Sequence, residues 1–233
     1  MDQLYDRVDH PKHINQGSTD FCGPAAVLYA LAKEDPQAYV RLGIDLFATG
    51  KATVRGWTID AGPLKDQALP QDMNIGCCDW VMMASVRRNV GFGGLTDVSN
   101  LAQGTLPTEI ATSLKQLGYG DVRNETYSTS VWKADEKNLV EAGALLSKGY
   151  RVILCVNDNM FKKPEAAPWK PNHFCTLKSQ PVIGERIKCR LWQWGIDHKE
   201  PKSDATAIFI NLPKMHFIQQ YFGYVAGGDY QIA

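Results

Sequence analysis

The chain has 233 residues, of which 44% are hydrophobic and 21% are charged, and its 25 Lys and Arg balance its 25 Asp and Glu. A chain of this length and composition buries a substantial core as an ordinary globular protein, and its balanced charge gives no sign of a nucleic-acid partner or an acidic membrane. No apolar run reaches the ~18 residues of a membrane span. Residues 1–5 show neither the basic segment nor the apolar segment of a secretory signal.

Six cysteines are spread along the chain, and none of their spacings matches a metal-ligand motif. Cys77 and Cys78 are adjacent, which suits neither a zinc site nor an easy disulfide, and we expect both to be structural. Three further thiols fall in predicted strands and are expected in the core: Cys155, Cys175 and Cys189. We therefore expect reduced thiols in a reducing compartment, with no metal and no organic cofactor.

The first half of the chain is expected to be mainly helical. Ala-rich or amphipathic segments with recognisable start and stop residues predict helices over residues 22–33, 36–50, 78–89, 107–118 and 134–148. Asp35-Pro36 is a typical capping residue followed by a first helical residue. The glycine-rich segment 90–95 lacks the Lys-Ser/Thr of a phosphate loop and predicts a turn.

The second half is expected to be mainly strands. The apolar run 150–156 predicts a buried strand, and residues 173–179, 186–194 and 207–211 predict three more. Residues 161–172 contain three prolines and predict a loop, while residues 213–222 predict a short last helix. Helices followed by an antiparallel sheet indicate an α+β fold, as one domain over 1–233 with a mainly helical half, 1–149, and a mainly β half, 150–233.

The segment Gln-Gly-Ser-Thr-Asp-Phe-Cys-Gly-Pro-Ala-Ala over residues 16–26 places Cys22 at the start of the first predicted helix. A helix N-terminus carries partial positive charge and unpaired N–H groups, which favours the thiolate form of a cysteine there. Cys22 is therefore the candidate nucleophile, and Gly23 is expected to let a substrate or backbone approach closely. A buried structural cysteine is the alternative for Cys22 taken alone.

Two further polar residues complete a candidate site for acyl transfer. Gln16, six residues before Cys22, is the candidate oxyanion donor together with the Cys22 N–H. His173, which opens a predicted strand, is the candidate general base. The alternatives are a surface glutamine and a core or surface histidine. Three of the remaining histidines are expected at the surface: His10, His13 and His198. The fourth, His216, is expected inside the last helix.

A third group usually orients the imidazole of a Cys-His pair. Gln193 is the candidate, because it falls on the apolar face of its strand, where a polar side chain needs a partner. The flanking Trp192 and Trp194 are expected to line a substrate-binding cleft or to pack in the core. The alternatives for the third group are Asn157, Asp158 and Asp197, or no third residue.

These residues resemble the papain-like cysteine peptidase superfamily. Gln16 and Cys22 are similar to the oxyanion glutamine and the nucleophile of that family, and His173-Phe174 at a strand start resembles its catalytic histidine. The segment 192–195, Trp-Gln-Trp-Gly, resembles the one that carries the third catalytic residue. The resemblance implies a papain-like fold, in which the nucleophile helix packs on a C-terminal antiparallel sheet. The family's asparagine position is occupied here by Trp192, which puts the third catalytic residue in question but not the nucleophile.

A narrower resemblance is to the papain-like toxin domains of bacterial polymorphic toxins and secretion-system effectors. Its marks are Cys-Gly-Pro-Ala-Ala at 22–26, Asp-Trp and Ala-Ser within 79–85, Pro-Asn-His at 171–173 and Trp-x-Trp-Gly at 192–195. The resemblance implies delivery by a bacterial secretion system, action in the target-cell cytoplasm and neutralisation by a cognate immunity protein. Since the chain begins almost at its glutamine, we expect no inhibitory N-terminal prosegment.

The leading hypothesis is a cysteine endopeptidase that acts as a bacterial toxin or effector on an intracellular protein, with no nucleic-acid and no membrane partner. The same residues would serve a glutamine deamidase or transglutaminase, because that choice depends on the shape of the cleft. A cell-wall amidase of the same superfamily is the next alternative, although such amidases usually lack the glutamine six residues before the cysteine. A non-enzymatic interaction domain on the same scaffold is the last.

Overall fold

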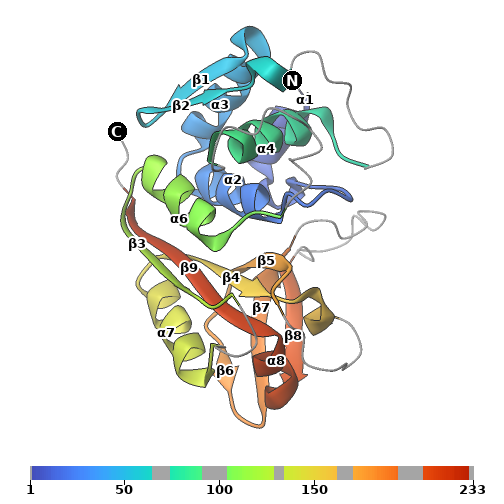
Figure 1. Ribbon diagram of the computed structural model, residues 1–233, viewed down its shortest axis with the longest axis vertical. Coiled ribbons are helices and arrows are strands. Elements are labelled where there is room, and N and C mark those ends of the chain that lie inside the picture. Colours follow the sequence, from blue (N-terminus) through green and yellow to red (C-terminus); the bar gives the residue numbers. More distant parts are fainter. Residues whose placement is uncertain are drawn as a thin grey trace. The chain divides into compact units, whose positions relative to one another are not determined.

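The computed structural model describes residues 2–64, 74–90, 104–128, 134–161, 170–193 and 207–230. Helices and antiparallel strand pairs make up these residues, so the predicted α+β class is confirmed (Figure 1). The chain divides into two compact units, the first formed by Met1–Gly120 with Tyr230–Ala233 and the second by Asp121–Asp229. The residues after 149 are richer in strands, as expected, whereas the compact units divide after Gly120.

Four helices of the first unit lie where the sequence predicts them: α2 (Cys22–Glu34), α3 (Pro36–Thr49), α4 (Cys77–Val90) and α6 (Pro107–Gln116). Local signals fix both ends of α3: Asp35 Oδ1 accepts the Ala38 N–H at 2.9 Å at its start, and Gly50, with a φ of 74°, ends the helix. Helix α2 is the centre of this unit. Every residue from Cys22 to Ala32 is buried, since α3, α4 and α6 all pack against α2.

Two segments of the first unit, residues 2–13 and 51–64, contain elements that were not predicted from the sequence. Helix α1 (Asp2–Asp9) precedes the short helix η1 (Pro11–His13), and Leu4, its one buried residue, packs against Gly43 of α3. Strands β1 (Lys51–Val54) and β2 (Trp57–Asp60) form an antiparallel hairpin, followed by the short helix η2 (Gly62–Leu64). A helix with one buried residue, or a strand of four residues, is too short to show a hydrophobic periodicity from which it could be predicted.

The hairpin turn between β1 and β2 holds Arg55 in the left-handed region, with a φ of 55°. Its guanidinium compensates for that conformation, since Nη2 donates to Asp35 Oδ2 at 2.7 Å and the group lies 5.0 Å from the centre of the Tyr230 ring. Tyr230 is the last residue of β9 (Tyr221–Tyr230) and belongs to the first unit. The hairpin is thus fixed by α3 on one side and by the end of a distant strand on the other.

The second unit is built on a sheet with the strand order β3-β9-β4-β5-β7-β6, to which β8 adds by pairing with β7. Strand β4 pairs antiparallel with β5 and β9, and β7 pairs antiparallel with β5, β6 and β8. The remaining bounds are β3 (Tyr119–Thr126), β4 (Arg151–Val156), β5 (His173–Leu177), β6 (Val182–Ile183), β7 (Arg186–Trp192) and β8 (Ala207–Pro213).

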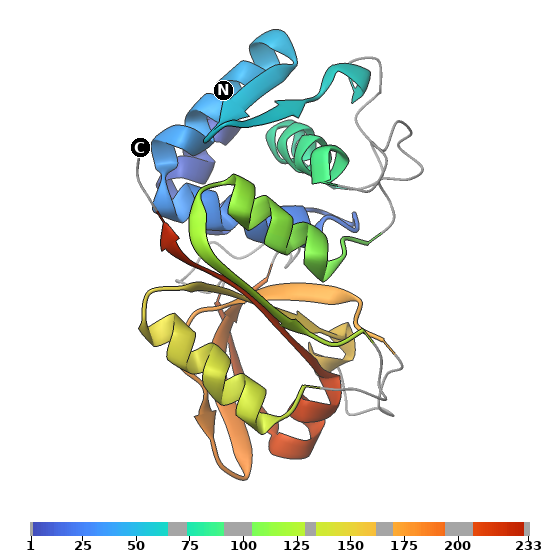
Figure 2. The same ribbon diagram turned by 60° about the vertical axis from the view of Figure 1, so that its left-hand side comes forward.

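The described residues of the second unit also form the α-helices α7 (Glu136–Ser147) and α8 (Lys214–Gln220), and the short helix η4 (Asp158–Phe161) follows β4. Helix α7 lies along one face of the sheet (Figure 2), and Tyr221 donates to Asn138 Oδ1 of α7 at 2.7 Å. The core beneath these helices is continuous across strands and helices, as shown by the fully buried Leu154, Cys175 and Phe217.

The last predicted helix is shorter than expected, because the chain turns at Tyr221 into the long strand β9. No strand was predicted for residues 221–230, a segment that contains three glycines. Gly223 has a φ of 101°, and a Cβ on it would collide with the Glu125 carbonyl. Strand β9 therefore needs glycine where it passes the backbone of β3.

Candidate active site

Cys22 is the first residue of α2, as predicted, and only 5% of it is exposed. Phe21 precedes it as the N-cap residue and makes no side-chain capping hydrogen bond, since it has no acceptor. Pro24, in the first turn, has no N–H. The peptide N–H groups of Cys22 and Gly23 therefore lie at the positive end of the helix dipole, where a negative charge is stabilised.

Gln16 lies in a tight turn just before α2. The Thr19 N–H donates to the Gln16 carbonyl at 3.2 Å, and Gly17 takes a φ of 59°, which glycine adopts without strain. The Gln16 Nε2 donates to the Thr19 carbonyl at 2.7 Å, while its buried Oε1 has no hydrogen-bond partner among the described residues. A primary amide has two N–H donors, so this side chain keeps a second donor that suits an oxyanion.

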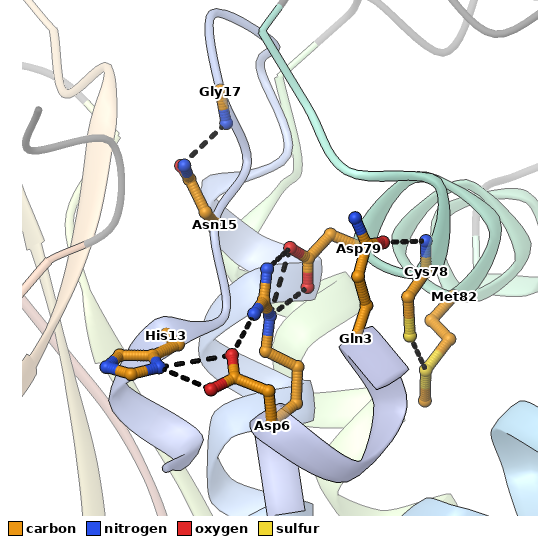
Figure 3. Close-up of polar contacts among 9 residues, drawn as sticks. Gln3, Asp6, His13, Asn15, Gly17, Cys78, Asp79 and Met82 are labelled. Atoms are coloured by element: carbon orange, nitrogen blue, oxygen red, sulfur yellow. Dashed lines mark hydrogen bonds and ion pairs between the residues drawn. The ribbon is translucent and has the colours of Figure 1, made fainter. Parts of the chain in front are cut away.

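The turn that carries Gln16 is anchored to α1 and α4 through Asp79 (Figure 3). Arg7 of α1 donates to Asp79, with Nη2 2.8 Å from Oδ2, and the carboxylate also accepts a hydrogen bond from the Asn15 backbone. Figure 3 shows Asp79 near the turn that begins at Asn15. Asn15 Oδ1 in turn accepts the Gly17 N–H at 2.9 Å. Asp79 is 1% exposed; burial raises its pKa, and the Arg7 guanidinium opposes that rise.

Gly23 meets a side chain of its own unit at close range. A Cβ on Gly23 would lie 2.6 Å from the Thr105 Cβ and 2.8 Å from its Oγ1, well inside van der Waals contact. Thr105 is 8% exposed, and its hydroxyl has no hydrogen-bond partner among the described residues. The Thr105 side chain therefore occupies the space beside Gly23, and the expected approach of a substrate or backbone at Gly23 stays a prediction.

His173 is the first residue of β5 and pairs with Val156 of β4. The ring of Phe161 in η4 meets the imidazole edge-on, with the ring centres 6.0 Å apart and the planes at 85°. Gln193 lies within hydrogen-bonding reach of the imidazole, and Asp158 lies close enough to act on its charge. His173 is partly buried by these neighbours.

The register of the sheet explains why Gln193 reaches His173. Thr176 pairs with Trp192, the last residue of β7, so Gln193, the residue that follows the strand, continues the register opposite Cys175 and diagonal to His173. The Gln193 Oε1 is buried and has no hydrogen-bond partner among the described residues. The predicted neighbour of the imidazole is therefore present in the same unit.

Two other candidates for the third residue can be placed. Asp158 lies near the imidazole, as described above, whereas Asn157 is turned to the loop and donates to the Lys170 carbonyl at 2.9 Å. Asp197 falls outside the described residues.

Burial is the largest influence on His173 and lowers the pKa of its imidazole to about 4, while Asp158 and Gln193 act in the opposite direction. At neutral pH the imidazole is therefore uncharged. That is the form that accepts a proton from a thiol.

The remaining predicted residues are placed as follows. Trp192 is 1% exposed and packs in the interior, while Trp194 lies outside the described residues together with His198. His10 is exposed, whereas His13 is partly buried, with Nδ1 2.9 Å from Asp6 Oδ1. His216 is 5% exposed in α8, in agreement with a structural role.

The predicted site residues are divided between the two units. Gln16, Cys22 and Gly23 belong to the first, and His173, Trp192 and Gln193 belong to the second. Within the second unit the structure brings His173 and Gln193 together. The pairing of Cys22 with His173 stays a prediction.

Two residues around these sites were missed from the sequence. The role of Asp79 could have been suspected from the sequence, because it is an acidic residue among apolar ones at the start of a helix. Thr105 had none, since nothing local distinguishes it from any loop threonine.

A comparison with models of known protein families gives no match, and a comparison with curated proteins gives none either. Within the described ranges, no group of three or more His, Cys, Asp or Glu side chains is arranged to hold a metal ion. No helix in the same part of the chain has both the length and the apolar character of a membrane span.

Proposed function

We propose that this protein is a papain-like cysteine endopeptidase. The observation that carries the proposal is the position of Cys22 as the first residue of a 13-residue helix whose residues from Cys22 to Ala32 are all buried. A thiol in that position is stabilised as a thiolate, and the adjacent peptide N–H groups stabilise an oxyanion. The neutral imidazole of His173, at a strand start with a polar neighbour at Gln193, is the matching base.

The proposed reaction has two halves. His173 accepts the Cys22 thiol proton while the sulfur attacks the scissile carbonyl carbon, and the resulting oxyanion is held by the Cys22 N–H and the second N–H of Gln16. His173 then gives its proton to the leaving amine, which leaves a thioester on Cys22. Water, deprotonated by His173, hydrolyses that thioester and restores the thiol.

The biological setting follows from the resemblance to papain-like toxin domains. We propose a bacterial effector that is delivered by a secretion system, cleaves a protein in the cytoplasm of the target cell, and is held inactive by an immunity protein in the producer. The sequence marks at 22–26, 79–85, 171–173 and 192–195 support this setting.

The test is a survey of new protein N-termini in bacteria that briefly express the chain, its Cys22→Ala variant or its Cys77→Ala variant. Cys77 is an exposed cysteine at the start of another helix, so its replacement is a matched control for loss of a thiol. A few new termini with the wild type and Cys77→Ala, absent with Cys22→Ala, are expected. Toxicity that depends on Cys22 without any new termini would contradict peptide hydrolysis and indicate side-chain deamidation or amidase chemistry instead.

A further inference from the structure

The short helix η4 is fixed to the residue that precedes His173. Asn172 Nδ2 donates to Asp158 Oδ1 at 2.7 Å, and the Asp158 backbone N–H donates to Asn172 Oδ1 at 2.8 Å. The Asn172 N–H donates to the Val156 carbonyl at 3.1 Å, next to the Val156–His173 pair of the sheet. Three hydrogen bonds thus fix Asp158 relative to the backbone that carries the imidazole.

The same helix places two side chains against His173. Phe161 contacts the ring edge-on, and Asp158 acts on its charge. Each other element described against the ring contributes an uncharged group: Val156 from β4 and Gln193 after β7. Among the described residues of the second unit, Asp158 is therefore the charged group that faces His173.

We propose that Asp158, held in place by Asn172, is a second positioning residue for His173, and that it supplies the negative charge that the neutral Gln193 lacks. This role rests on the proposed function for its place in the reaction. The imidazole becomes positive when it accepts the thiol proton, and a nearby carboxylate stabilises that cation. Gln193 restricts the orientation of the ring, and Asp158 offsets the cost of charging a buried imidazole.

A merely structural role for Asp158 makes a different prediction. Asp158→Asn keeps an oxygen that can accept the Asn172 Nδ2 hydrogen bond, and it keeps the backbone N–H that donates to Asn172. If Asp158 only closes the loop, this variant leaves His173 unchanged. If Asp158 acts through its charge, the variant changes the imidazole although the loop is intact.

The experiment is an NMR titration of the ¹⁵N-labelled His173 imidazole in full-length Cys22→Ala protein, with and without Asp158→Asn. Removal of an opposite charge at this range should lower the pKa of His173 by about one unit. The matched control is Glu185→Gln, which removes one exposed carboxylate of the same unit and should leave the titration of His173 unchanged. An equal midpoint in the Asp158→Asn and control proteins would overturn the proposal.

The kinetic counterpart uses a peptide that the wild type cleaves. Asp158→Asn should lower kcat about tenfold with an unchanged KM, because the charge acts on the cation and not on substrate binding. Asp158→Glu should recover part of the loss. A rise in KM with an unchanged kcat would also overturn the proposal. The NMR titration requires no activity, so a shifted His173 in a protein that cleaves nothing would support the electrostatic role of Asp158 and count against the peptidase.

Discussion

The carboxylate of Asp79 accepts a hydrogen bond from the guanidinium of Arg7 at 2.8 Å, although 72 residues separate them. Only 1% of Asp79 is exposed, so the pair is a largely buried ion pair between α1 and α4. Because Asp79 also accepts the Asn15 backbone hydrogen bond, the pair fixes the start of the turn that carries Gln16. A contact far from the nucleophile in sequence thus contributes to its surroundings.

Removing the Arg7 guanidinium from this ion pair should lower the stability of the fold. Arg7→Met leaves the buried Asp79 carboxylate without its cation, and we expect the free energy of unfolding to fall by about 3–5 kcal/mol. Asp79→Asn removes the charge together with the need for a partner and should cost less. Urea unfolding measures both, with the exposed Asp9→Asn of α1 as the control. Equal midpoints for Arg7→Met and the control would show that the pair contributes nothing.

Gln16→Ala should impair the chemical step. If the second Nε2 hydrogen binds the oxyanion, its loss should reduce kcat by about 10²–10³. The Thr19 hydrogen bond is lost as well, at a cost in stability of about 1 kcal/mol, so the assay belongs far below the unfolding temperature. Ser18→Ala, an exposed change in the same turn, is the control. A Gln16→Ala enzyme with normal kcat would remove Gln16 from the mechanism.

Gly23→Ala tests the contact with Thr105. On propensity alone, alanine would stabilise a helix by up to about 1 kcal/mol over glycine. Here the new Cβ would lie 2.6 Å from the Thr105 Cβ, and we expect a net loss of about 1–3 kcal/mol from overpacking.

Truncating the neighbour should reverse that loss. The double variant Gly23→Ala with Thr105→Gly should recover most of the stability, as a thermodynamic cycle on the unfolding free energies would measure. Additive effects in the cycle would mean that the two residues do not touch in solution.

The low pKa of His173 makes stability depend on pH. In the folded protein the pKa is about 4, below the ordinary value of 6.5, so the unfolded chain binds the proton more readily. Above pH 6.5 the imidazole is neutral in both the folded and the unfolded state and does not change the free energy of unfolding. As the pH decreases from 6.5 to 4, the unfolded chain binds the proton first, and the free energy of unfolding falls. The loss is at most about 3 kcal/mol for the full shift.

His173→Gln is the variant that checks this pH dependence, because glutamine does not titrate. Its unfolding free energy, measured by urea denaturation through the acid range, should decline less steeply between pH 6.5 and pH 4 than that of the wild type. The surface His10→Gln should follow the wild type. Parallel curves for wild type and His173→Gln would mean that the imidazole keeps its ordinary pKa in the fold.

The parts of the fold that could be predicted are those with strong local signals. Helices α2 and α3 follow directly from a long apolar run and from the Asp35-Pro36 cap, and β4 follows from five consecutive buried residues. Strand β9 could not be predicted, because the need for glycine at Gly223 comes from the passing backbone of β3, which is distant in sequence. The hairpin of β1 and β2 depends on the distant Tyr230, which no local window contains.

The same distinction holds for the site. Cys22 at a helix start and His173 at a strand start were predicted, since each position depends on neighbours in sequence. The surroundings of the imidazole could be predicted only in part. Gln193 followed from the alternation of its strand, whereas Asp158 remained one of several candidates until the reciprocal hydrogen bonds with Asn172 singled it out.

The return of Tyr230 to the first unit has a consequence during synthesis. Arg55 and Asp35 emerge from the ribosome early, while the aromatic ring that Arg55 covers is made only after the whole second unit. The N-terminal unit, including the helix that begins with Cys22, therefore lacks one of its stabilising contacts while the second unit is being synthesised. We expect the nascent chain to gain its final resistance to proteolysis late, when the stretch carrying Tyr230 has left the exit tunnel.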